Sequence, residues 1–120
     1  MRIGRLKEIS ATVRSLKTTT FTAEEDLLFI DLISEIDTIY AEDDKKLSTL
    51  LSKYEITLED GRPIGEQKEK FMEAYNLMNN VEFDSKTKIS WEMIRKLKNE
   101  NNLNLSIFKL FVDNFMQKKQ

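Results

Sequence analysis

The sequence predicts a mainly α-helical protein, built as a long antiparallel helical hairpin with flanking short helices and a small two-stranded β element. Two observations support this fold class. Apolar residues recur every three or four positions along several segments, which is the spacing of one helix face. Only three glycines and one proline occur in 120 residues, although the turns of β-rich domains need such residues. The length suits a single domain comprising residues 1–120.

The first two predicted helices follow from apolar spacing and a capping signal. Residues 4–18 carry apolar positions separated by three, four and three residues: Leu6, Ile9, Val13 and Leu16. Thr22 and Glu25 form a capping box, which starts a second helix of about 30 residues over 22–56. Along this helix the apolar residues are spaced alternately four and three positions apart. The exception is Asp43, which stands where the pattern calls for an apolar residue. The polar residues 41–46 are either a solvated stretch or a break between two helices, and we favour one continuous helix.

A loop and a third helix complete the predicted hairpin. Residues 59–65, with the sequence EDGRPIG, contain turn-forming residues and form the clearest predicted loop. The apolar pattern of residues 66–79 predicts a helix that ends at Asn79 and Asn80, because asparagine tolerates a left-handed cap. We therefore expect residues 22–56 to pack antiparallel against residues 66–79.

The last third of the sequence predicts a short β element and a helix pair. Residues 81–84 alternate apolar and polar, so they predict a strand that pairs either with residues 87–89 or with Arg2 and Ile3. Ser90 is the expected N-cap of a short helix that ends near residues 101–102. Residues 105–117 predict a final helix that is apolar over most of its surface, so it either packs against the core or forms a homodimer interface.

The same periodicity predicts the core. We expect Trp91, the one tryptophan, to anchor the core rather than an interface. The full expected core comprises Leu32, Ile33, Ile36, Tyr40, Leu47, Leu50, Tyr54, Phe71, Tyr75, Met78, Trp91, Ile94, Phe108, Phe111 and Phe115.

Composition restricts the chemistry that this chain can perform. The chain has no cysteine and no histidine, so it lacks the residues used for thiolate metal sites, for cysteine nucleophiles and most often for general bases. Three consecutive acidic residues at 42–44 point in different directions on a helix and do not converge on one ion. We therefore expect a non-enzymatic protein without a cofactor or metal. The sequence lacks an 18-residue apolar stretch and an apolar signal-peptide core, which predicts no membrane partner and a cytoplasmic location.

Charge is unevenly distributed along the chain. Residues 1–20 carry a net charge of +4, residues 21–60 of −9 and residues 61–120 of +3. The acidic segment is either a solvated helix face or a surface that attracts a nucleic-acid-binding protein, and the basic residues near the N-terminus could contact phosphate. The candidate partner-binding acidic residues are Glu35, Glu42, Asp43 and Asp44. The candidate phosphate or RNA contacts are Arg2, Arg5, Arg14 and Lys17.

The order of features over residues 21–98 resembles that of small phage-encoded proteins of unknown function. The segments that carry the resemblance read LSKYEITLEDGRPIG, YNLMNN and VEFDSKTKIS. In size and character the chain is also similar to anti-CRISPR inhibitors. The resemblance implies a protein that binds and inhibits a host nucleic-acid-processing protein, such as a CRISPR effector nuclease with its guide RNA. The alternative is an accessory protein of the phage virion or of tail assembly.

Overall fold

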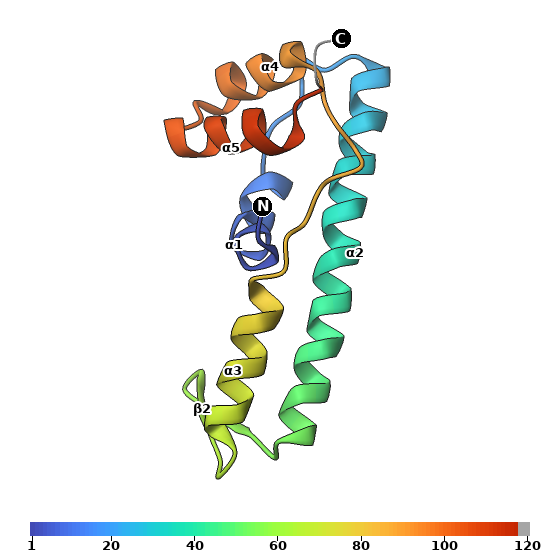
Figure 1. The fold of residues 1–120 in the computed structure, drawn as a ribbon. Coiled ribbons are helices and arrows are strands. Elements are labelled where there is room, and N and C mark those ends of the chain that lie inside the picture. The colour runs from blue at the N-terminus through green and yellow to red at the C-terminus, as the bar shows by residue number, and fades with distance from the viewer. Residues whose placement is uncertain (118–120) are drawn as a thin grey trace.

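A computed structural model describes residues 1–117 and confirms the mainly α-helical fold (Figure 1). One long helix runs along the molecule. A shorter helix and a small sheet lie beside one end of it, and the other three helices lie toward the middle and the opposite end (Figure 1). The elements, in chain order, are α1 (Ile3–Arg14), α2 (Ala23–Lys53), β1 (Thr57–Glu59), β2 (Arg62–Ile64), α3 (Lys68–Asn79), α4 (Trp91–Asn101) and α5 (Leu105–Phe115).

Helix α2 is continuous, as the sequence predicted. Its capping box is present: the Thr22 hydroxyl accepts a hydrogen bond from the Glu25 amide at 3.2 Å, and the Glu25 carboxylate accepts one from the Thr22 amide at 2.9 Å. The helix continues for 31 residues to Lys53 without a break at residues 41–46. At 1.5 Å per residue this is about 46 Å, which accounts for most of the 52 Å length of the molecule.

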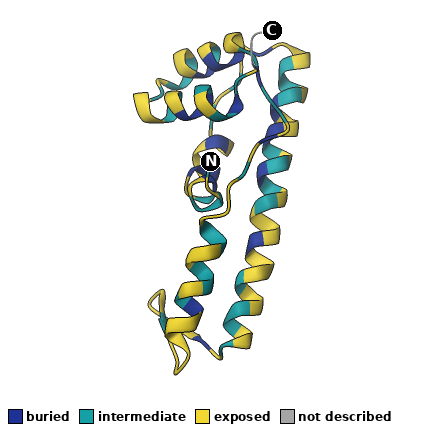
Figure 2. Cartoon of the chain, viewed as in Figure 1, coloured by how far each residue is buried: buried dark blue, intermediate teal, exposed yellow. Residues whose placement is uncertain are grey.

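The hydrophobic core is concentrated in one half of the molecule, which we call the head (Figure 2). The head consists of α1, the N-terminal half of α2, α4 and α5. Its buried apolar residues are Leu6, Ile9, Val13, Phe21, Phe29, Leu32, Ile36, Ile89, Met93, Ile94, Leu97, Leu110, Phe111 and Phe115. The C-terminal half of α2, the sheet and α3 form a projecting arm. Among the described residues of the arm, the buried apolar side chains are Ile56 and Phe71.

The two-stranded element lies at a different place from the one predicted. The sequence predicts it near residues 81–89, but strands β1 and β2 form an antiparallel hairpin over residues 57–64, which overlaps the segment 59–65 predicted as a loop. Asp60 and Gly61 both have positive φ angles, of 51° and 76°, as a two-residue type I′ hairpin turn requires. Residues 81–89 contribute isolated bridges instead: Glu82 pairs with Arg2, which was one of the two predicted alternatives, and Ile89 pairs with Met116.

Two residues of the predicted core are exposed. Trp91 is 48% exposed, because it lies in the first turn of α4 and meets Phe108 edge-on at the surface, with 5.7 Å between ring centroids. Tyr40 is exposed on α2 and lies 5.8 Å from the Lys7 ammonium. The predicted core residues of the arm, except Phe71, are half-buried, because a two-helix hairpin cannot enclose them on every side: Leu47, Leu50, Tyr54, Tyr75 and Met78.

Helix α5 faces the head core. Leu110, Phe111 and Phe115 are buried there, whereas Leu105 at its start is exposed. Most of the apolar surface of α5 is therefore covered within the chain. A homodimer through residues 105–117, all of which the structure describes, remains a prediction. No helix among residues 1–117 combines the length and apolar character that crossing a membrane requires.

Candidate functional site

The four acidic candidates have different environments, and Asp43 is buried. Its side chain is 3% exposed, and its Oδ2 lies 2.6 Å from the Lys7 Nζ of α1. The expectation that Asp43 is an exposed charge is therefore wrong. Asp43 occupies an apolar register position of α2, so its side chain points toward α1, where Lys7 neutralises it. Burial by itself would lower the pKa of Lys7, but the hydrogen bond and the attraction to Asp43 outweigh burial and raise that pKa.

Glu35 is a structural residue that holds the linker between α3 and α4. Its carboxylate accepts hydrogen bonds from the Ser85 hydroxyl at 3.2 Å, the Lys86 amide at 2.7 Å and the Thr87 amide at 3.0 Å. Burial tends to raise the pKa of Glu35, but these hydrogen bonds, that of the Lys86 amide foremost, lower it overall. The carboxylate is therefore occupied within the chain, and the predicted use of Glu35 in partner binding would require breaking these bonds.

Glu42 and Asp44 are exposed, as predicted, and Glu42 belongs to a longer feature that sequence reasoning missed. Glu24, Asp31 and Glu42 are separated by 7 and 11 residues, which are close to two and three whole helical turns. They therefore lie along one face of α2, which we call the acidic row. All three are exposed, and none of them forms an ion pair within residues 1–117.

Two exposed apolar side chains accompany the acidic row. Leu27 is 65% exposed, and Ile30 is exposed as well. Both lie between Glu24 and Asp31 in the sequence and are displaced from the buried side of α2, where Phe29 and Leu32 face the core. Apolar groups beside unpaired charges are typical of docking surfaces. The signal in the sequence was the helical spacing of Leu27 and Ile30 outside the main apolar positions.

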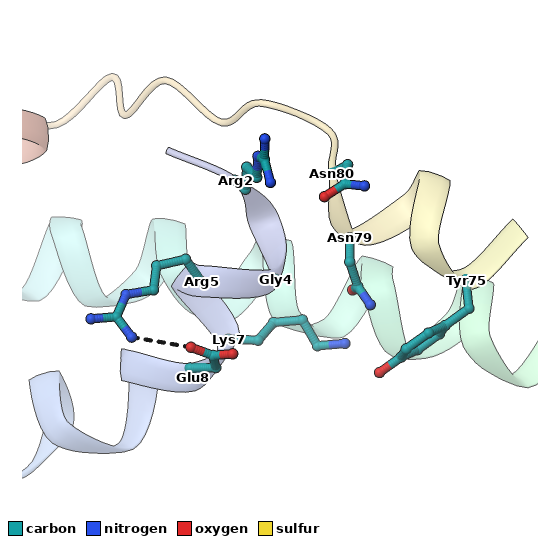
Figure 3. A pocket seen from close by; sticks show the side chains of 8 residues that line it. All are labelled: Arg2, Gly4, Arg5, Lys7, Glu8, Tyr75, Asn79 and Asn80. Carbon is teal, nitrogen blue, oxygen red and sulfur yellow. Dashed lines mark hydrogen bonds and ion pairs between the residues drawn. The ribbon is translucent and has the colours of Figure 1, made fainter. Parts of the chain in front are cut away.

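The structure brings two of the four basic candidates together. Arg2 and Arg5, at the start of α1, line a cleft of about 510 Å³ with Lys7, Tyr75 and Asn79 (Figure 3). The cleft lies where α1 meets the end of α3. Gly4 favours this close approach, because a Cβ there would lie 3.2 Å from the Asn79 backbone oxygen, which is tighter than an ordinary van der Waals contact.

The cleft carries charges of both signs. The Arg5 guanidinium lies 3.1 Å from the Glu8 carboxylate, and Lys7 is paired with Asp43. A second cleft of about 430 Å³ shares Arg2 and Arg5, and it adds Lys109 together with acidic Asp113 and Glu82. A polyanion would therefore meet carboxylates as well as cations here.

The other two basic candidates lie apart from this cleft. Arg14 forms an ion pair with Asp37 of α2. Lys17 follows α1, and its backbone amide and carbonyl are both hydrogen-bonded to the Asn101 side chain. The four predicted phosphate contacts are thus divided between two places, and phosphate binding by any of them stays a prediction.

No group of three or more acidic side chains within residues 1–117 is placed to hold a metal ion. The chain matches no protein family, no curated protein and no solved structure.

Proposed function

We propose that this chain is a non-enzymatic, phage-encoded or mobile-element protein that binds and inhibits a host nucleic-acid-processing protein. The proposed partner is a CRISPR effector nuclease, met in the host cytoplasm. The observation that carries the proposal is the acidic row, in which Glu24, Asp31 and Glu42 are exposed and unpaired along one face of α2. Proteins that process nucleic acids neutralise phosphates with lysine and arginine, so their binding channels are complementary to such a row.

The geometry of the row supports a contact of useful size. Glu24 and Glu42 are 18 residues apart, which is about 27 Å along the helix. Leu27 and Ile30 lie beside the row and can lose their contact with water when a partner covers them. The charges would accelerate encounter and set orientation, and the apolar groups would slow dissociation. Arg2, the N-cap of α1, and Arg5 in its first turn are the residues proposed to touch the guide RNA of such a partner.

Inhibition of purified nucleases tests this proposal. The chain is added to a panel of CRISPR effector ribonucleoproteins, and cleavage of a matched target DNA is measured at two salt concentrations. At least one effector should be inhibited. The double variant Asp31→Lys/Glu42→Lys should weaken that inhibition on the order of tenfold, because complementary charges at a contact rim govern association. The loss should shrink at higher salt, where charges are screened.

A matched control separates the acidic row from total charge. Glu59→Lys/Glu66→Lys makes the same change in net charge at the exposed tip of the arm and should leave inhibition unchanged. An equal loss in both double variants would show a nonspecific charge effect and contradict the role of the row. A panel in which no nuclease is inhibited or bound would contradict the proposed function itself.

The exposed apolar residues at the tip of the arm favour a second candidate, an accessory role in a phage virion or in tail assembly. Leu58 and Ile64, on the two strands of the hairpin, are both exposed, and subunits of assemblies bury such groups against their neighbours. Mass spectrometry of purified virions distinguishes the candidates, because a stoichiometric amount of the chain is expected in particles for an assembly protein and not for an inhibitor.

A further inference from the structure

An apolar groove of about 560 Å³ lies between the C-terminal half of α2 and α3. Leu50 of α2 lines one side, Ala74, Leu77 and Met78 of α3 line the other, and Val81 closes its upper end. Leu77 is 67% exposed, and Val81 is also exposed. Because the arm contains two packed helices rather than three, this apolar surface has no covering element within the described chain.

The α2 wall of the groove is basic. Lys45 and Lys46 line it, are exposed, and form no ion pair with any described residue. The hydroxyl of Thr49, which also lines this wall, donates a hydrogen bond to the Lys45 carbonyl oxygen at 3.0 Å. That hydroxyl is already satisfied within the helix, so the two ammonium groups are the polar groups that the wall offers to a ligand.

The chain covers the neighbouring part of α2 with its own backbone. The linker leaves α3 at Val81 and runs beside α2 toward the head (Figure 1), where Glu35 holds residues 85–87 by three hydrogen bonds. The linker therefore lies along the N-terminal half of α2. The groove lies between α3 and the C-terminal half of α2, and the linker does not cover this part of the hairpin.

We propose that the groove binds an amphipathic helix of a partner protein, with acidic residues beside the apolar face of that helix. The α2 wall extends from Lys45 to Leu50, about 8 Å at 1.5 Å per residue. The α3 wall extends from Ala74 to Met78, and Val81 prolongs it beyond the end of that helix. A docked helix therefore contacts the groove over between one and two turns. A helix that docks in such a groove inserts apolar residues at positions i, i+3 or i+4, and i+7. Glutamate or aspartate beside them would meet Lys45 and Lys46.

This surface is distinct from the acidic row, although Glu42 at the end of the row lies one helical turn before Lys45 and Lys46. It uses different residues, it has the opposite charge, and it selects an acidic rather than a basic partner. The inference does not rest on the proposed inhibition of a nuclease, and either can fail without the other.

Peptide binding to the full chain tests the inference. The probe is a fluorescein-labelled 15-residue helical peptide with leucines at i, i+4 and i+7 and flanking glutamates. One control peptide has lysines in place of the glutamates, and another has serines in place of the leucines. Fluorescence anisotropy should show that the acidic peptide binds at least about tenfold more tightly than either control.

Variants of the chain locate the binding site. Leu77→Ser should weaken binding of the acidic peptide about tenfold, because it removes an apolar contact in the groove. Lys45→Glu/Lys46→Glu should reverse the preference, so that the lysine peptide binds better. The control Lys86→Glu/Lys109→Glu makes the same charge change on exposed residues outside the groove and should bind as the unaltered chain does. Far-UV circular dichroism verifies that each variant is folded.

Three results would overturn the inference. The first is equal affinity for the acidic and lysine peptides. The second is acidic-peptide affinity that neither Leu77→Ser nor Lys45→Glu/Lys46→Glu changes. The third is a dimer in sedimentation equilibrium that Leu77→Ser dissociates, since this result would assign the groove to a second copy of the chain.

Discussion

Replacing Lys7 by methionine should destabilise the protein strongly, because it leaves Asp43 buried without its counter-charge. The Asp43 carboxylate is 3% exposed and has the Lys7 ammonium at 2.6 Å. Methionine keeps most of the apolar stem of lysine and removes the charge. Removing one partner of a buried pair costs about 3–5 kcal/mol of unfolding free energy. The Lys7 side chain is 17% exposed, so water can reach the vacated site, and we expect about 3 kcal/mol.

Removing both charges should cost much less than removing one. The double variant Lys7→Met/Asp43→Leu replaces the pair with apolar groups of similar size, which is often neutral for stability. Urea denaturation of the two single variants and the double variant gives a thermodynamic cycle. A loss below about 1 kcal/mol for Lys7→Met, or a double variant as unstable as the worse single one, would refute the reasoning that Asp43 depends on Lys7.

The same pair predicts how stability depends on alkaline pH. Asp43 raises the pKa of Lys7 above the 10.5 of a free lysine side chain, against the opposing effect of burial. The unfolded chain therefore loses this proton at a lower pH than the folded one. The stabilisation is complete below pH 10.5 and is lost as pH rises through the higher folded pKa. Lys7→Met should lack this component of the alkaline loss in urea titrations at increasing pH.

Three further substitutions test the linker and the core. Glu35→Ala should lower the unfolding free energy by about 1 kcal/mol, because the linker donors lose their acceptor, and hydrogen exchange at the Lys86 and Thr87 amides should accelerate. Because the pKa of Glu35 is lowered in the folded state, its contribution should be present above pH 4.5 and fade as pH falls. Trp91→Phe should cost less than about 1 kcal/mol since the ring is half exposed, whereas Phe111→Ala should cost about 3–5 kcal/mol, both measured by urea denaturation.

The helices could be predicted from the sequence because their signals are local. A capping box at Thr22 and Glu25 and a regular apolar spacing are enough to place α2, since neither depends on distant residues. The β hairpin also had a local signal, the Asp60–Gly61 pair, which favours a type I′ turn between strands. The concentration of Gly61, Pro63 and Gly65 pointed to a loop instead, and the sheet was expected elsewhere.

The environments of the acidic residues could not be predicted, because they depend on how distant segments pack. Asp43 visibly interrupts an apolar pattern in the sequence, but only the position of α1 identifies Lys7 as its partner. Glu35 is indistinguishable from a surface glutamate until residues 85–87 are placed beside it. The exposed row of Glu24, Asp31 and Glu42 could be assigned only after the buried face of α2 was known.

The head has more buried apolar residues than the arm, so we predict that the two parts unfold locally at different free energies. The head buries apolar residues from four helices, whereas the arm buries Ile56 and Phe71 among its described side chains. Segments with few buried apolar contacts exchange their amide hydrogens through local opening. Amides of β1, β2 and α3 should therefore exchange faster than those of α4 and α5 under native conditions. Bound peptide in the groove should slow exchange in α3. Equal protection of α3 and α5 in the free chain would contradict this division and mean that the arm unfolds together with the head.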